Sequence, residues 1–438
     1  MLICDFFMKI AFILGEFPVL SETFILNQIT GLISRGHEVH IYGYRPDDMS
    51  KIHPDIEKYQ LLQRTHYIPS ISTNYLGRVL KGLGLIVTNL HKSPLVILRS
   101  LNFLKYGKYA TSLRLLYSVI PLLKSKQYDI IHGQFGMHGI EGQILRDIGA
   151  IEGKLVTSFR GYDISYYVQE CGEDVYNELF VKGDFFLANC EFFRQKAINL
   201  GCDRNKIVVL RSGIDCSRFQ FKARRPNANN KIRIVTVGRL VEKKGIEYGI
   251  RALAKVANVH PNVEYNVIGD GYLKTELHLL IEELKITDKV KLLGWKNQQE
   301  IIDILDNSHL FIAPSVTAQD GNQDAPVNTL KEAMAMGLPV IGTFHGGIPE
   351  LVQDGVSGFL VPERDADAIA EKLIYLIEHP DIWENMGAVG RTCVEANYDI
   401  NKLNDKLVEI YQLVAMTPHQ PSQEEMSVVT ANREYTNP

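Results

Sequence analysis

The chain has 438 residues, of which 45% are hydrophobic and 22% are charged, and its formal net charge is −4. This balance is typical of a soluble globular protein, and the length suits two or three domains. A slightly negative chain has no long-range attraction to nucleic acid, so we expect no nucleic-acid partner.

The cysteines and the N-terminus indicate a cytoplasmic protein. Six cysteines, at positions 4, 171, 190, 202, 216 and 393, form no CxxC pair and no metal-like spacing with histidine, so we expect reduced thiols. The opening MLICDFFMKIAFIL lacks the basic start and cleavage site of a signal peptide, and residues 1–7 are predicted to be a non-structural extension. No stretch reaches the roughly 18 uncharged apolar residues that a spanning helix needs.

The first half alternates short apolar segments with helical patterns. The expected strands are 9–14, 39–44, 129–135, 154–159, 184–190 and 206–211. They are β-branched and apolar, as in strands that are buried on both faces. A helical pattern covers 22–35 and stops at Gly36.

After a polar segment, the second half again alternates expected strands and helices. Strands are expected at 232–237, 263–268, 290–295, 310–313 and 338–341, with helices between them such as 246–258 and 271–286. Two runs of βα units predict an α/β fold with two Rossmann-like, doubly wound domains that face each other across a cleft. We place the domains at 8–212 and 231–398, with a linker at 213–230. A helix over 399–416 is expected to pack back on the first domain, and a polar tail over 417–438 is expected to be disordered.

The segment 58–128 has an unusual charge pattern, because it contains no Asp or Glu. It holds eleven basic residues, Lys58, Arg64, Arg78, Lys81, Lys92, Arg99, Lys105, Lys108, Arg114, Lys124 and Lys126. Interleaved apolar residues favour an amphipathic surface on anionic lipid, where each basic residue adds about 1 kcal/mol. We therefore expect a peripheral protein at the inner face of the membrane. The alternative is a set of core-packing helices with solvated lysines.

The segment TVGRLVEKKGIEYGI (236–250) places Gly238, Arg239 and Lys244 between a strand and a helix that begins after Gly245. Ligands bind at the carboxyl ends of strands in open parallel sheets, and a helix N-terminus offers free N–H groups to phosphate. Arg239 and Lys244 would add positive charge and hydrogen-bond donors. A simple chain-reversing turn is the alternative.

Two further segments follow later strands of the second domain. In QDGNQDAPVNTLKEAMAMGLPV (319–340), Asp324 lies at the mouth of an expected helix and Glu332 lies within it, so both carboxylates can accept hydrogen bonds from ribose and sugar hydroxyls. Alternatively, Asp324 is an N-cap and Glu332 a solvated surface acid. In TFHGGIPELVQDGVSGFLV (343–361), Gly346 and Gly347 permit close backbone approach before a helix expected to start at IPELV, or form a plain turn.

The first domain carries two comparable loops. Gly15 and Pro18 follow the first strand, and Ser21 with Glu22 opens a helix. Arg160, Gly161 and Asp163 follow the strand KLVTSF. Both loops would lie at the carboxyl edge of the first sheet and face the second domain.

Together these motifs resemble the retaining glycosyltransferases of group 1, or family 4, which have the two-Rossmann-domain GT-B architecture. The resemblance spans about residues 8–415 and is strongest in VGRLVEKKG, DGNQDAPVNTLKEAMAMGLPV and GGIPELVQDGVSGFLV, with NVIGDG and LLGW in the same order. The opening GEFPVLSETFILNQI is similar to the exopolysaccharide, colanic-acid-type subgroup.

The resemblance implies roles for the matching positions. It implies donor binding by Gly15, Gly238, Arg239, Lys244, Asp324, Glu332, Gly346 and Gly347, and catalysis by Arg160, Asp324, Arg239 and Lys244. Arg239 and Lys244 would hold the donor diphosphate, and Asp324 and Glu332 would stand in the family's E-x7-E motif.

The chain departs from the family pattern in three places. The first acid of E-x7-E is Asp324, and Pro326 comes one place early. Arg160 stands in SFRGYD where many members have a histidine, and an arginine cannot act as a general base at neutral pH. It can stabilise a departing phosphate or hold a substrate hydroxyl. Family members often have the sequence H-x-H where this chain has His132 and Gln134, and we interpret His132 as structural.

The expected function is therefore transfer of a hexose, with retention, from a UDP- or GDP-sugar to a lipid-linked or growing cell-surface polysaccharide. No metal-ligand spacing is present, so we expect no metal and no cofactor besides the donor. Two alternatives remain: a nucleotide-sugar epimerase, and a non-catalytic nucleotide-sugar-binding partner of a glycan assembly complex.

Overall fold

The structure is a computed structural model, and it describes residues 7–19, 22–46, 48–49, 52–124, 126–226, 231–324 and 327–418. The expectations for residues 1–6, Ser21, the end of the linker (227–230), Pro326 and the tail from 419 lie outside these ranges.

The first domain contains a parallel seven-stranded sheet in the order β3-β2-β1-β4-β5-β6-β7. Its strands are β1 (Lys9–Glu16), β2 (Glu38–Tyr44), β3 (Thr65–Tyr67), β4 (Gln127–Gln134), β5 (Glu152–Phe159), β6 (Phe185–Ala188) and β7 (Ile207–Val209). The order reverses between β1 and β4, which creates a crevice at their carboxyl ends where ligands bind in such sheets.

The second domain contains a parallel six-stranded sheet in the order β10-β9-β8-β11-β12-β13. Its strands are β8 (Ile232–Val237), β9 (Val263–Ile268), β10 (Val290–Leu292), β11 (Leu310–Ala313), β12 (Val340–Thr343) and β13 (Phe359–Val361). The corresponding reversal falls between β8 and β11. The two doubly wound sheets confirm the predicted fold class. The sequence analysis missed β3 and β13, which are three-residue edge strands.

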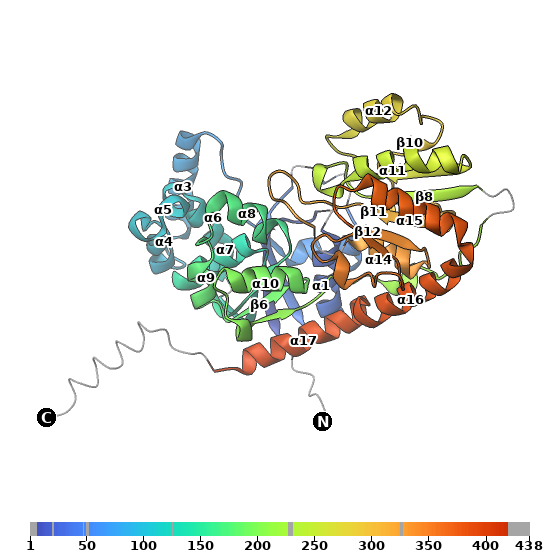
Figure 1. The fold of residues 1–438 in the computed structure, drawn as a ribbon. Coiled ribbons are helices and arrows are strands. Elements are labelled where there is room, and N and C mark those ends of the chain that lie inside the picture. The colour runs from blue at the N-terminus through green and yellow to red at the C-terminus, as the bar shows by residue number, and fades with distance from the viewer. Residues whose placement is uncertain are drawn as a thin grey trace, which may run out of the picture.

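Helices cover both sheets (Figure 1). Those of the first domain are α1 (Thr23–Ser34), α2 (Pro54–Lys58), α3 (Tyr75–Asn89), α4 (Pro94–Ser100), α5 (Phe103–Thr111), α6 (Arg114–Val119), α7 (Gly136–Asp147), α8 (Tyr166–Cys171), α9 (Asn177–Lys182) and α10 (Glu191–Asn199). The remaining ones are α11 (Ile246–Val259), α12 (Lys274–Glu283), α13 (Gln298–Asp306), α14 (Asn328–Ala335), α15 (Ala366–Glu378), α16 (Trp383–Asn397) and α17 (Ile400–Met416). Buried apolar clusters lie on both faces of each sheet, as doubly wound folds require.

Helix α17 returns from the second domain and runs beneath the first (Figure 1). Its Leu407, Tyr411 and Val414 belong to the same buried cluster as Phe12 of β1 and Ile29 of α1. Asp399 caps this helix by accepting hydrogen bonds from the first turn. The chain therefore crosses between the domains twice, near residue 213 and near residue 399.

The segment that we predicted as a linker packs against the second domain as far as it is described. Ile214 and Phe219 join the core beneath β8 and β11. The guanidinium of Arg224, which is buried, donates to the carbonyl oxygens of Asp306, Ser308 and Met336. The sequence shows no hydrophobic periodicity over this segment, because single side chains, rather than one face of a helix or strand, attach it to the second domain.

Candidate active site

The second-domain half of the site begins where β8 ends. Gly238 follows the strand, and the short 3₁₀ turn Glu242–Lys244 leads to Gly245, after which α11 begins. Gly245 has a φ of +57°, and a Cβ atom there would lie 1.9 Å from the carbonyl oxygen of Pro314. The chain therefore requires glycine at this position, and this contact sets the position of the turn that carries the lysines.

Two lysines of this turn converge on Asp324. Lys244 Nζ lies 2.6 Å from Asp324 Oδ2, and Lys243 Nζ lies 3.0 Å from Oδ1. Lys243 Nζ also contacts Asn322 Oδ1 at 3.1 Å. Burial raises the pKa of the Asp324 carboxyl, but attraction to Lys244 and Lys243 outweighs burial and holds that pKa well below its ordinary value. Asp324 is thus ionised and holds both ammonium groups in place.

A second layer of contacts holds the backbone at Asp324. The Asp324 N–H donates to His345 Nε2 at 2.9 Å, and His345 Nδ1 lies 2.6 Å from Glu363 Oε1. Burial lowers the pKa of His345 despite the pull of Glu363, so the ring is neutral and can accept at Nε2. Glu363 thus holds His345, which holds the backbone of Asp324, whose carboxylate binds the two lysines.

The glycine pair lies against the same loop. Gly346 has a φ of +50°, and a Cβ atom there would lie 2.0 Å from the carbonyl oxygen of Asp324. The expected helix at IPELV is wrong, because Ile348–Glu350 forms only a three-residue 3₁₀ turn with Gly347 before it. The helix-dipole argument for Gly346 and Gly347 therefore fails, and backbone contact is the reason for glycine at Gly346.

Helix α14 carries Glu332 into this half of the site. Thr329 Oγ1 donates to the carbonyl oxygen of Val237 at 2.8 Å, which ties the start of α14 to the end of β8. Burial raises the pKa of Glu332 to about 7. Its carboxyl group forms no hydrogen bond or ion pair with the described residues, so it has acceptor capacity to offer a ligand.

The neighbouring Lys331 points to the crossing between the domains. Lys331 is 1% exposed, and its ammonium group donates to the carbonyl oxygen of Ser212 at 2.7 Å and to Asn328 Oδ1 at 2.9 Å. Burial lowers its pKa to about 7. Arg239, in contrast, is exposed after β8 and forms no ion pair with the described residues.

In the first-domain half of the site, Gly15 lies next to the side chain of His138. A Cβ atom at Gly15 would lie 3.2 Å from His138 Nε2, and His138 lies in the first turn of α7. Glu22 precedes α1 but does not cap it through its side chain. Burial raises the pKa of Glu22, although nearby His138 and Arg160 act in the opposite direction.

Arg160 is directed toward the floor of the site rather than toward Asp324. Its guanidinium donates to Gln134 Oε1 at 2.6 Å, Gln28 Oε1 at 3.0 Å and Ser212 Oγ at 3.2 Å, and it stacks on Phe24. Arg160 is only 8% exposed and forms no ion pair with the described carboxylates. Burial lowers its pKa to about 10, so it stays charged at neutral pH.

Two other polar residues from the sequence analysis are structural here. Asp163 accepts hydrogen bonds from the N–H groups of Gly136, Arg160 and Gly161, which shapes the loop after β5. His132 is fully buried, with Nδ1 2.5 Å from Tyr411 Oη and Nε2 2.7 Å from Ser158 Oγ.

The two halves are in contact. Glu350 accepts hydrogen bonds from the N–H groups of Glu191 and Phe192 at the start of α10, at 2.9 and 3.0 Å. The Gln323 carbonyl oxygen would lie 3.2 Å from a Cβ atom at Gly161. The loop before Asp324 therefore contacts the loop that follows Arg160.

Sequence reasoning missed several residues of this arrangement. The sequence pattern predicts a role for Lys244 but none for its neighbour Lys243, and none for His345 or His138. It predicts only that Glu22 opens a helix. A histidine beside a glycine loop gives no sequence signal of its own, since the contact between Gly15 and His138 joins segments far apart in the chain.

Within the described ranges, no three His, Cys, Asp or Glu side chains lie close enough to hold a metal ion. Over those same ranges, every helix is too short or too polar to cross a membrane. The five cysteines that are described are unpaired, and Cys4 lies outside the described residues.

Comparison with known proteins gives two consecutive family matches. The family described as Glycosyltransferase Family 4 matches residues 21–218, and Glycosyl transferases group 1 matches residues 217–392. The chain is 33% identical to a putative colanic acid biosynthesis glycosyltransferase, WcaL of Salmonella typhimurium, over 93% of this chain and all of the relative. It is 35% identical to the amylovoran biosynthesis glycosyltransferase AmsK of Erwinia amylovora, again over 93% and 100%.

Among solved structures, the fold is similar to Anabaena Alr3699/HepE, which was crystallised in complex with UDP and glucose. The TM-score is 0.65 at 19% identity, and the match covers 92% of this chain and 99% of that one. At this identity the likeness concerns the fold alone.

Proposed function

The chain belongs to the glycosyltransferases of group 1 and family 4, and from this premise we propose that it transfers a hexose with retention from a nucleotide-diphosphate sugar. Its two Rossmann-like domains form the GT-B architecture. The observation that carries the proposal is the convergence of Lys243 and Lys244 on Asp324 at the β8/β11 crevice, opposite the loop of Arg160.

The donor proposal follows from the chemistry of this crevice. A diphosphate there would meet Lys244, the exposed Arg239 and the N–H groups at the start of α11. Glu332 would accept hydrogen bonds from ribose hydroxyls, and Asp324 would lie near the donor sugar. The UDP and glucose bound to the structurally similar HepE support a UDP-hexose as the first donor to test.

We propose a displacement on one face of the sugar. The bond from the anomeric carbon to the phosphate oxygen breaks, and a bond to the acceptor oxygen forms on the same face. The acceptor proton passes to the departing phosphate oxygen. Arg239 and Lys244 stabilise the negative charge that develops on that phosphate, so we expect transfer to continue in excess EDTA.

The acceptor proposal rests on the relatives. WcaL and AmsK are named for the biosynthesis of two polysaccharides, colanic acid and amylovoran. We therefore propose that this chain extends a lipid-linked or growing cell-surface polysaccharide. A lipid-linked acceptor would require the protein to work at a membrane surface.

The helical layer α3–α5 supports such a surface. It forms the outer end of the first domain (Figure 1). Four apolar side chains of α3 are exposed, namely those of Leu76, Leu80, Leu83 and Val87. They follow one another at intervals of four, three and four residues. This spacing forms one helix face. Exposed apolar residues continue on the next two helices at Leu95, Leu98, Phe103 and Leu104. Lys81, Lys92, Arg99, Lys105 and Lys108 lie exposed among them, which suits an anionic lipid surface.

A matched pair of leucines tests this surface. Leu80 on α3 is 62% exposed, and Leu279 on α12 in the other domain is 61% exposed. We expect Leu80→Glu to lower sedimentation with phosphatidylserine-containing vesicles about tenfold at low salt, and Leu279→Glu to leave it unchanged. Equal effects of both substitutions, or no sedimentation of the unaltered chain, would refute membrane binding through α3.

One observation favours the non-catalytic alternative: the guanidinium of Arg160 is bound to Gln28, Gln134 and Ser212. Nucleotide release from UDP- and GDP-hexoses separates the alternatives. A transferase releases nucleotide much faster when a polysaccharide precursor is added. An epimerase converts the sugar without release, and a binding partner shows a thermal shift with donor and no turnover.

A further inference from the structure

The start of helix α10 depends on the second domain for its hydrogen bonds. Glu191 and Phe192 lie in the first turn, where backbone N–H groups have no partner within the helix. Both groups donate instead to the carboxylate of Glu350, at 2.9 Å to Oε2 and at 3.0 Å to Oε1. Arg211, which comes just before the first crossing between the domains, adds a guanidinium nitrogen 3.9 Å from Oε2. One carboxylate of the second domain therefore satisfies two donors of the first.

Glu350 is held in this direction by its own domain. It ends the 3₁₀ turn Ile348–Glu350, and Ile348 is fully buried in the core beneath β8 and β11. The carbonyl oxygen of Glu350 accepts a hydrogen bond from Tyr398 Oη at 3.4 Å. The turn follows directly after Gly346 and Gly347, so the loop that we propose for the donor leads straight to the carboxylate that binds α10.

Helix α10 also contacts the other loop that we propose for the donor. Lys196 Nζ donates to Gln323 Oε1, in the loop that ends at Asp324. The N–H of Gln323 donates to Ser165 Oγ at 3.4 Å, in the segment that follows Arg160. Both proposed donor loops of the second domain are therefore bonded to the first domain at or beside α10.

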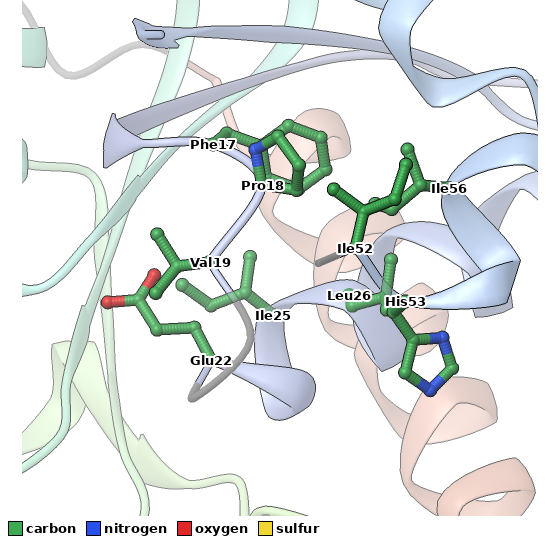
Figure 2. Close-up of a pocket in the computed structure, with 9 residues that line it drawn as sticks. All are labelled: Phe17, Pro18, Val19, Glu22, Ile25, Leu26, Ile52, His53 and Ile56. Atoms are coloured by element: carbon green, nitrogen blue, oxygen red, sulfur yellow. The ribbon is translucent and has the colours of Figure 1, made fainter. Parts of the chain in front are cut away.

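The segment after β1, in contrast, is held within the first domain. Phe17, Leu26 and Ile56 line one small pocket (Figure 2) and are buried in the same apolar cluster. The N–H of Phe17 donates to the carbonyl oxygen of Tyr44 in β2 at 3.0 Å. Separation of the domains would leave these contacts in place, whereas it would leave the first turn of α10 without an acceptor in the protein.

The ionised acceptor makes the contact at α10 a strong one. Hydrogen bonds to a charged acceptor are about twice as strong as neutral ones, and the positive end of a helix favours a carboxylate. Opening of the cleft would break both bonds to Glu350 together. Domains of one chain move relative to each other unless their interface prevents it, so a contact of this strength bears on whether the cleft is open or closed.

We propose that Glu350 and the start of α10 form a latch that holds the two domains in contact, an inference whose role in catalysis rests on the proposed transferase function. Transfer requires the donor on the second domain and the acceptor on the first to meet in one closed cleft. The latch therefore sets the fraction of molecules in which the two halves of the site are assembled. Glu350 acts through the placement of the domains and touches no substrate.

The test follows hydrogen exchange of single amides in the full chain, by mass spectrometry with fragmentation. Glu350→Ala removes the acceptor of the Phe192 N–H, so we expect exchange at Phe192 to be about tenfold faster or more. Because the domains then separate, exchange at Gln323 should also accelerate, by about threefold or more. Two control amides, those of Phe17 and Arg233, donate within their own domains and should exchange as before.

A matched pair of substitutions tests the latch from the side of α10. Proline suits the first position of a helix and requires an extended residue before it, which Cys190 is, with φ −158° and ψ 163°. Glu191→Pro removes one donor and places a ring carbon against Glu350, so we expect exchange at Gln323 to be about threefold faster or more. Glu191→Ala keeps the N–H and loses only a side chain that pairs with Arg194, so it should change nothing. Combined with Glu350→Ala, the proline should add less than about twofold.

The latch is refuted if Glu350→Ala leaves exchange at Phe192 unchanged, or accelerates it there and not at Gln323, because the bonds would then be purely local. Glu350→Ala that accelerates the two control amides as well has lost its fold, and the Glu191 pair, which leaves the second domain unaltered, then gives the answer. Equal exchange at Gln323 in Glu191→Pro and Glu191→Ala would overturn the proposal.

Donor binding is measured separately, by calorimetric titration with UDP-glucose and with GDP-mannose. Gly346 and Ile348 hold the donor loop without Glu350, so Glu350→Ala should keep the affinity within about threefold. A chain that shows the expected exchange pattern and binds neither donor would refute the proposed function and leave the latch standing. Donor binding together with unchanged exchange in the variants would refute the latch and leave the proposed function standing.

Discussion

On the second domain, the loops that carry Lys244 and Asp324 are set by backbone contacts at glycine, whereas on the first domain the loop of Arg160 is set by side chains. Gly245 and Gly346 each leave no room for a Cβ atom beside a carbonyl oxygen. Arg160 instead is held by Gln28 and Gln134. Under the proposed function, the side that binds phosphate is fixed by the backbone, whereas the side that binds the acceptor can change by substitution of side chains.

The largest effect should come from Gly346→Ala. The new methyl group would lie 2.0 Å from the carbonyl oxygen of Asp324, at a backbone φ of +50° that alanine avoids. We expect a loss of about 3 kcal/mol or more and at least about a hundredfold weaker donor binding, measured by calorimetric titration with UDP-hexose.

Gly15→Ala is the matched change on the other side. There the methyl group would meet His138 Nε2 at 3.2 Å, and an imidazole can rotate. We expect under about 1 kcal/mol of destabilisation. If both glycines tolerate alanine equally, the contrast between the two sides is mistaken.

Arg160 tests the side-chain network of the first domain. Arg160→His would leave Gln28 and Gln134 without their shared donor, because an imidazole is too short to reach both. We expect about 2–4 kcal/mol less stability in urea unfolding and no gain in transfer. Arg225→Met is the control, because that side chain is 77% exposed, and it should change stability by under about 0.5 kcal/mol. A large gain in transfer for Arg160→His would show that the native residue impairs catalysis.

We expect pH to change donor binding less than Gly346→Ala does, and we expect this pH dependence to arise from Glu332. Burial raises the pKa of Glu332 to about 7, and only the carboxylate form can accept both ribose hydroxyls. Its ionised fraction falls from about ten-elevenths at pH 8 to about one-eleventh at pH 6, so donor affinity should fall about tenfold as the pH is lowered. In Glu332→Gln this part of the pH dependence should vanish. An unchanged profile in that variant would exclude Glu332 from donor binding.

Most of the architecture could be predicted from the sequence, because buried parallel strands have a local signature. The turns at Gly245 and Gly346 were also predictable, because each glycine follows a strand, but the carbonyl groups of Pro314 and Asp324 that exclude a Cβ atom lie in other loops. The helix at IPELV was predicted wrongly, because the chain ends its turn after Glu350 to place that carboxylate on α10. The helix propensity of a segment contains no information on such a contact between domains.

The side-chain network of the first domain could not be predicted. Gln28, Gln134, Arg160 and Ser212 lie on four different segments, and none of them has a neighbour in sequence that reveals the contact. The same limit applies to Asp324, whose bond to Lys243 depends on a side chain in another βα unit.

The cations of the second domain are proposed to hold the leaving diphosphate, and removing them tests this role directly. The measurement is the initial rate of hexose transfer by Arg239→Ala/Lys244→Ala, compared with Arg251→Ala/Lys255→Ala, which removes the same charge from exposed positions on α11. We expect the first pair to lower the rate by about a thousandfold or more and the second to leave it within about twofold. Transfer at the original rate by the Arg239 and Lys244 double variant would contradict the account.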